Sequence, residues 1–152
     1  MLRSAFLAVH VGAGVAGLLV GPGAISAALR DRRGTRAGQA YLASVTVLTA
    51  TAVGLVALGP GVLWPFLLLA AATEAAVIGA WFVDARATHV RLVCGSYVSL
   101  VTALTVVRWG TLLAWVVPTL MGTALVEWAA LSTRRPRPAR TPSRSPTPSP
   151  QP

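Results

Sequence analysis

Five runs of mostly apolar residues divide the chain, and short polar or glycine-rich segments separate them. Each run is about 18 to 25 residues long, so a helix formed from it would reach across the roughly 30 Å hydrocarbon core of a bilayer. The runs occupy residues 5–29, 41–58, 62–83, 89–107 and 111–131. The pattern predicts an all-α integral membrane protein, a bundle of five transmembrane helices.

Two other interpretations of this pattern fit it less well. A cleaved signal peptide has an apolar core of roughly 7 to 15 residues, whereas the run at 5–29 is much longer. One helix over residues 95–131 would be about 55 Å long, nearly twice the hydrocarbon thickness. We therefore divide that stretch at Trp109-Gly110, where a tight turn is expected.

Glycines and a proline mark the first run. His10, Gly14, Gly17 and Gly21 follow one another at helical spacing, so they share one face. Small residues at this spacing are typical of close packing against a neighbouring membrane helix. Pro22 follows directly, and we expect a kink or an early helix end there.

The second run carries four hydroxyl side chains, and it ends at a short turn over residues 59–61. A hydroxyl in a membrane helix can donate to the preceding turn of its own helix or to a partner helix. The four residues are Ser44, Thr46, Thr49 and Thr51.

Residues 134–152 differ from the rest of the chain. They hold seven prolines and five arginines among nineteen residues. Such a segment cannot bury a core, so we predict a disordered Pro/Arg/Ser-rich tail with extended polyproline character.

The arginines predict the orientation. The chain has thirteen basic residues, all Arg, and eleven of them lie in segments 30–39 and 84–91 and in the tail. The other side of a five-span bundle would carry Arg3 and Arg108. Basic residues concentrate in cytoplasmic loops, so the N-terminus is expected outside and the C-terminus in the cytoplasm.

The composition agrees with a bilayer environment and reduces the number of partner classes to be expected. With 55% hydrophobic and 11% charged residues, the chain is too apolar for an ordinary soluble domain. The net charge of +9 would suggest nucleic acid in a soluble protein, but here the arginines flank apolar runs, so no nucleic-acid partner is expected. The single cysteine, Cys94, excludes an intrachain disulfide and a cysteine-cluster metal site.

Polar side chains within the predicted spans are candidates for function because hydrocarbon disfavours them. Glu74 lies roughly 18 Å from the outer boundary, near the midplane, so its carboxyl must be protonated, paired or open to water. His10 lies roughly 8 Å from the outer boundary. Arg108 follows the fourth run at its outer end, on the helix face that also carries Tyr97. We expect His10, Glu74, Tyr97 and Arg108 to line a polar cavity, where Arg could hold an oxygen and His could exchange protons.

A second polar layer is expected at the cytoplasmic edge, formed by His89, Arg91 and Glu127. Glu127 can pair there with Arg91 or with the tail. No cofactor is expected, because one haem would need both imidazoles at the same depth, and His10 and His89 are roughly 20 Å apart. No metal site is expected either, since the only ionisable group at the level of His10 is another cation.

Four short motifs follow one another along the chain. They are a His before a glycine-rich helix with Gly-Pro, a basic loop with Gly and Tyr, a His and Arg segment with Ser-Tyr and a later Arg, and a closing Trp, Pro and Glu. Their residues are His10, Gly14, Gly21, Pro22, Arg36, Gly38, Tyr41, His89, Arg91, Ser96, Tyr97, Arg108, Trp115, Pro118 and Glu127. Together they resemble the bacterial predicted membrane proteins grouped as domain of unknown function 2306. The resemblance implies a multi-pass protein of the bacterial plasma (inner) membrane, and it implies no particular reaction.

The lipid bilayer is the expected surrounding of the protein, and two hypotheses for its function remain open. The bundle could bind or handle a small amphiphilic molecule in its polar cavity. Alternatively, it could be a non-enzymatic protein that packs with itself or with another membrane protein through its glycine faces. A haem or redox role is disfavoured by the depths of the two histidines.

Overall fold

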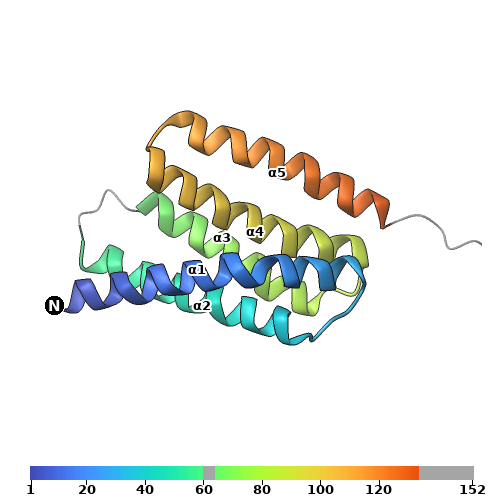
Figure 1. The fold of residues 1–152 in the computed structure, drawn as a ribbon, viewed down its shortest axis with the longest axis horizontal. Helices are drawn as coiled ribbons and strands as arrows, with labels where there is room; N and C mark the ends of the chain where they lie inside the picture. The colour runs from blue at the N-terminus through green and yellow to red at the C-terminus, as the bar shows by residue number, and fades with distance from the viewer. Residues whose placement is uncertain (60–63, 134–152) are drawn as a thin grey trace, which may run out of the picture.

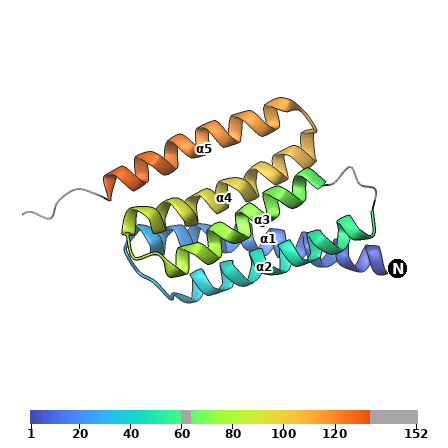
Figure 2. The same ribbon diagram turned by 180° about the vertical axis from the view of Figure 1, so that it is seen from behind.

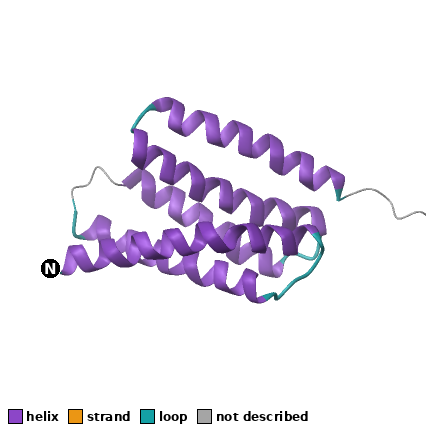
Figure 3. Ribbon diagram, viewed as in Figure 1, coloured by secondary structure: helices purple, strands orange, loops and turns teal. Residues whose placement is uncertain are grey.

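The computed structural model of the 152-residue chain describes residues 1–59 and 64–133. This part of the chain folds into five α-helices and contains no strand (Figures 1 and 3). The helices are α1 (Leu2–Leu29), α2 (Arg36–Ala57), α3 (Trp64–Phe82), α4 (Arg86–Trp109) and α5 (Leu112–Ser132). The predicted all-α fold of five helices is therefore confirmed.

Four of the helices, α1, α2, α4 and α5, are long and apolar enough to cross a membrane. The apolar part of α3, Phe66–Phe82, is shorter. The run predicted over residues 62–83 begins outside the described part of the chain. Two of the three residues of the turn expected at 59–61 also lie outside it. The tail predicted over residues 134–152 also lies outside the described residues.

Successive helices run in opposite directions along one elongated bundle (Figure 1). The N-terminal end of the bundle holds the start of α1 and the turn between α4 and α5, and the opposite end holds the loops that follow α1 and α3. Helix α5 lies outermost and packs mainly against α4, as both views show (Figure 2). Four helices therefore form a compact group, and the fifth covers one side of it.

Local chemistry explains where two of the helices begin and end. Thr35 precedes α2, and its Oγ1 accepts a hydrogen bond from the backbone N–H of Gly38 at 3.2 Å, as expected of an N-cap. Gly110 follows α4 with φ of 61°, a left-handed conformation that glycine adopts without steric cost. The turn predicted at Trp109-Gly110 is thus confirmed.

Helix α1 continues through Pro22 to Leu29, so an early helix end at the proline is wrong. Gly17 and Gly21 are buried on the same helix. A Cβ atom at Gly21 would lie 2.3 Å from the ring of Tyr97, and one at Gly17 would lie 3.2 Å from Leu100. The glycine face of α1 is therefore packed closely against α4, which confirms its prediction as a packing surface.

The core consists of two clusters in which small side chains are frequent. One joins α1, α2, α3 and α4, and the other joins α1, α4 and α5. The buried residues of the first are Ala24, Tyr41, Val45, Val77 and Leu100, and those of the second are Ala28, Val90, Cys94, Val126 and Ala130. Large apolar side chains instead cover the outside, for example Leu112 at 78% and Trp128 at 72% exposure. Small residues between helices and large apolar residues outside are typical of membrane bundles.

Candidate functional site

A cavity of about 380 Å³ lies between α1, α2, α3 and α4, in the half of the bundle nearer the N-terminal end. We call it the apolar cavity. Leucine, valine, alanine and phenylalanine side chains make up most of its wall. Its polar lining residues are His10, Thr49, Thr73 and Ser99.

His10 is fixed against α2 through one ring nitrogen. Its Nδ1 lies 3.1 Å from the carbonyl oxygen of Leu48 and 3.1 Å from Oγ1 of Thr51. Because a carbonyl oxygen can only accept, Nδ1 carries the proton and donates it. In the neutral ring, Nε2 is then an acceptor, and within the described part of the chain no hydrogen bond occupies it.

Of the four residues predicted to share a cavity, only His10 lines the apolar cavity. Thr73 does so in place of Glu74, because one residue turns a helix by about 100°. Glu74 lies instead between α3 and α2, where its Oε1 accepts a hydrogen bond from Thr46 Oγ1 at 2.7 Å. Its other oxygen is buried and has no hydrogen-bond partner among the described residues.

The other two predicted cavity residues have separate surroundings. Tyr97 packs between α1 and α2, and Arg108 is exposed in the last turn of α4. A cation in that position interacts favourably with the negative end of the helix dipole. Among the described residues, the lining of the apolar cavity therefore contains one imidazole and no other ionisable group.

Tyr97 has a specific role next to Pro22. Proline has no N–H, so the carbonyl oxygen four residues earlier, that of Leu18, loses its helical hydrogen bond. Tyr97 Oη donates to this oxygen at 3.3 Å. Gly21 allows the approach because it has no Cβ atom in the space that the tyrosine ring occupies.

A proline in the interior of α5 has a related but weaker contact. Pro118 lies in α5, and the carbonyl oxygen that it leaves without a helical partner is that of Ala114. Thr105 Oγ1, from α4, lies 3.4 Å from that oxygen. Thr105 Oγ1 is closer to two carbonyl oxygens of its own helix, those of Val101 at 2.9 Å and Thr102 at 2.8 Å. A hydroxyl has a single proton, so the bond to Ala114 is at most a weak, shared one, unlike the bond from Tyr97 to Leu18.

The predicted layer at the opposite end is present in part. Arg91 donates from Nε to Glu127 Oε1 at 2.8 Å and from Nη2 to Oε2 at 2.6 Å, a bidentate pair between α4 and α5. His89 does not join this pair. Its Nδ1 donates to the carbonyl oxygen of Ala80 at 2.7 Å instead.

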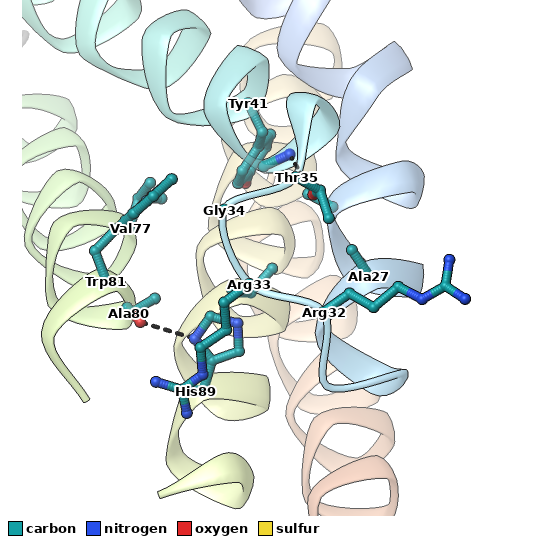
Figure 4. A pocket seen from close by; sticks show the side chains of 13 residues that line it. Ala27, Arg32, Arg33, Gly34, Thr35, Tyr41, Val77, Ala80, Trp81 and His89 are labelled. Atoms are coloured by element: carbon teal, nitrogen blue, oxygen red, sulfur yellow. Dashed lines mark hydrogen bonds between the residues drawn. The ribbon is translucent and has the colours of Figure 1, made fainter. Parts of the chain in front are cut away.

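His89 lines a different, smaller pocket of about 60 Å³ beneath the loop after α1 (Figure 4). Arg33 closes this loop over the end of α3 by donating to the carbonyl oxygens of Val83 and Asp84 at 2.5 and 2.6 Å. Thr35 and Trp81 also line the pocket. Its volume suits water or a very small solute, and an amphiphile would not fit.

Sequence reasoning singled out the hydroxyls of α2, and the structure shows what each of them does. Ser44 donates to its own helix, Thr49 reaches the carbonyl oxygen of Ala70 at 3.5 Å, and Thr46 and Thr51 are the partners of Glu74 and His10. Arg33 was missed as a structural residue, because in the sequence it is one of several arginines in a basic loop. Within residues 1–59 and 64–133, no group of three His, Cys, Asp or Glu side chains could hold a metal ion.

No family model, no curated protein and no solved structure matches this chain. The resemblance to domain of unknown function 2306 therefore stays a prediction. Several residues on which it rests nevertheless meet in the structure. The rings of Tyr41 and Tyr97 lie 6.4 Å apart, Tyr41 Oη is 3.1 Å from Ser96 Oγ, and Gly21 faces Tyr97.

Proposed function

We propose that this chain is a multi-pass protein of the bacterial inner membrane that binds a small amphiphilic molecule in the apolar cavity. The observation that carries the proposal is the setting of His10. One imidazole, held by α2 through Nδ1, lines a cavity whose remaining wall is almost entirely apolar. A large apolar pocket with few polar groups is the usual form of a small-molecule site, and about 380 Å³ lies within the usual range of volumes.

The tautomer of His10 indicates the chemistry of the ligand. With Nδ1 donating to Leu48, Nε2 of the neutral ring offers a lone pair. It would accept a hydrogen bond from a hydroxyl or phenol group. The ligand that fits is therefore an apolar body with a hydroxyl head.

The alternative, a protein that binds partners through glycine faces, has less support. The glycine face of α1 is already occupied inside the chain, since Gly21 meets Tyr97 and Gly17 meets Leu100. These glycines serve internal packing, so they do not offer a free surface for another helix.

Photolabelling tests the binding proposal. The purified protein in lipid nanodiscs would be irradiated with a long-chain alcohol that carries a diazirine, and labelled residues would be identified by peptide mass spectrometry. We expect labels on cavity residues such as Leu48 and Leu104. The variant Ala103→Phe, which fills the cavity, should lose them. Ala124→Phe, on the exposed side of α5, is the matched control and should keep them.

The role of His10 has its own readout. His10→Phe keeps an aromatic ring but removes the acceptor, so the preference for the alcohol over the corresponding methyl ether should fall about fivefold, the loss expected for one hydrogen bond. If the cavity residues of Ala103→Phe are labelled as strongly as those of the wild type, the proposed site is contradicted. An unchanged preference in His10→Phe would contradict the role of the imidazole.

The proposed orientation places the N-terminus outside and the C-terminus in the cytoplasm. It is supported by the arrangement of the bundle, because the loop of residues 30–35 and the start of α4 lie together at the opposite end from Arg3 and Arg108. In a Cys94→Ala background, Arg3→Cys should react with an impermeant maleimide on intact cells. Arg32→Cys should react only after permeabilisation, and its efficient labelling from outside would overturn the orientation.

A further inference from the structure

A second recess of about 300 Å³, more polar than the apolar cavity, lies between α4 and α5. We call it the α4–α5 groove. Its lining differs from that of the apolar cavity, because charged and hydroxyl side chains make up much of it. They are Arg91, Ser99, Thr102, Thr119, Thr123 and Glu127. On α5 the polar positions from Thr119 to Glu127 span about 12 Å along the helix axis.

The hydroxyl groups of the groove have unused hydrogen-bonding capacity. Thr102 is 2% exposed, and its Oγ1 is buried without a hydrogen-bond partner in the described part of the chain. Ser99 and Thr119 donate to carbonyl oxygens one turn earlier, at 3.2 and 2.7 Å, so their oxygens can still accept. Lipid chains offer no hydrogen bond to the remaining lone pairs of these oxygens, whereas water does.

One end of the groove is marked by a partly exposed ion pair. The pair between Arg91 and Glu127 lies there, and its side chains are 30% and 47% exposed. An ion pair of this exposure is expected at the level of the lipid headgroups rather than within hydrocarbon. The groove thus leads from the ion pair towards the hydroxyls in the middle of the bundle.

We infer that the α4–α5 groove is a hydrated site, filled by water that enters beside Arg91 and Glu127 and hydrogen-bonds to the hydroxyls of Ser99, Thr119 and Thr123. Leu69 and Ser99 line both the groove and the apolar cavity. Water in the groove would therefore come within one layer of side chains of the proposed amphiphile site. The inference stands on the lining of the groove and does not require that the apolar cavity binds a ligand.

Cysteine accessibility tests the hydration of the groove. In a Cys94→Ala background, Thr119→Cys and Thr123→Cys would be compared with Leu120→Cys and Ala124→Cys, their neighbours at nearly the same depth. All four positions are exposed on α5, so the substitutions should not disturb the core. The reagent is a methanethiosulfonate that carries a trimethylammonium group. The protein is in lipid nanodiscs, so the reagent in solution reaches both membrane faces.

The expected result follows from thiol chemistry. Only the thiolate reacts, and apolar surroundings raise the pKa of a thiol, so the groove cysteines should react about tenfold faster than their neighbours for each unit of difference in pKa. Reaction of Thr119→Cys and Thr123→Cys no faster than Leu120→Cys and Ala124→Cys would overturn the inference. It would show that lipid or a second copy of the chain fills the groove.

A blocking variant gives a second test. Gly95 lines the groove, and a Cβ atom there would meet nothing within 4 Å, as at Gly12 on the exposed side of α1. Gly95→Val should therefore fit the fold and slow the labelling of Thr123→Cys, whereas Gly12→Val should leave the rate unchanged. Equal rates in both backgrounds would show that the reagent does not reach Thr123 through the groove, which would also overturn the inference.

Discussion

At the scale of single residues, the contact between Tyr97 and α1 shows how this bundle tolerates a proline inside a helix. Pro22 removes the N–H that would bond Leu18, and Tyr97 Oη supplies a replacement at 3.3 Å. Tyr97→Phe should therefore reduce the free energy of unfolding by about 1 kcal/mol, the net value of one hydrogen bond.

A double-mutant cycle isolates this contribution. In a Pro22→Ala background, the backbone N–H at position 22 can bond the Leu18 carbonyl again, so Tyr97→Phe should cost clearly less there. Thermal unfolding in detergent measures the four proteins. If Tyr97→Phe costs the same in both backgrounds, the hydroxyl does not replace the bond that proline removes.

Gly21 and Gly12 form a matched pair of glycines on α1. A methyl group at Gly21 would meet the Tyr97 ring at 2.3 Å, whereas one at Gly12 would meet nothing within 4 Å. Gly21→Ala should thus destabilise the protein by about 1–3 kcal/mol through overpacking. Gly12→Ala should be neutral or slightly stabilising, because alanine favours helix. Similar melting temperatures for the two variants would contradict the packing described for α1 and α4.

At the scale of helices, α5 is held mainly by α4, and the Arg91–Glu127 pair links the two. Arg91→Glu or Glu127→Arg alone would place like charges together, so each should lower the melting temperature by a few degrees. The double reversal should recover more than half of the loss. As a control, Asp84→Asn should change little, since the Asp84 carboxylate is fully exposed and 4.0 Å from Arg33. A double variant no more stable than either single one would show that the pair does not help to hold α5.

The sequence predicts the helices well because their apolar lengths and their breaks are local properties. The turn at Trp109-Gly110 follows from one glycine, and the packed face of α1 follows from the spacing of Gly17 and Gly21. The continuation of α1 through Pro22 could not be predicted in this way. It depends on Tyr97, a residue on another helix that bonds the free carbonyl.

The candidate site is less predictable because it depends on how helices are rotated about their axes. Depth alone suggested that His10 and Glu74 could cooperate. The rotation of α3 places Thr73 in the apolar cavity and directs Glu74 to Thr46 of α2. The pair of Arg91 and Glu127 was easier to foresee, since opposite charges near one end of neighbouring helices readily meet.

At the scale of the whole molecule, small residues are frequent in the core and large apolar side chains cover the surface, as suits a lipid environment. The two larger recesses of the bundle, the apolar cavity and the α4–α5 groove, differ in the chemistry of their linings. The apolar cavity suits the body of an amphiphile and has His10 for its head, whereas the α4–α5 groove suits water. Their shared wall at Ser99 and Leu69 would bring an apolar ligand and a polar medium close together.

Native mass spectrometry of the protein purified in mild detergent tests the proposed ligand most directly. The wild-type chain should retain an adduct of defined mass, distinct from bulk phospholipid. Ala103→Phe should lose this adduct, and Ala124→Phe should retain it. A bare subunit, an oligomer that carries only ordinary phospholipid, or an adduct that persists in Ala103→Phe would contradict the proposal that the apolar cavity is a binding site for a small amphiphile.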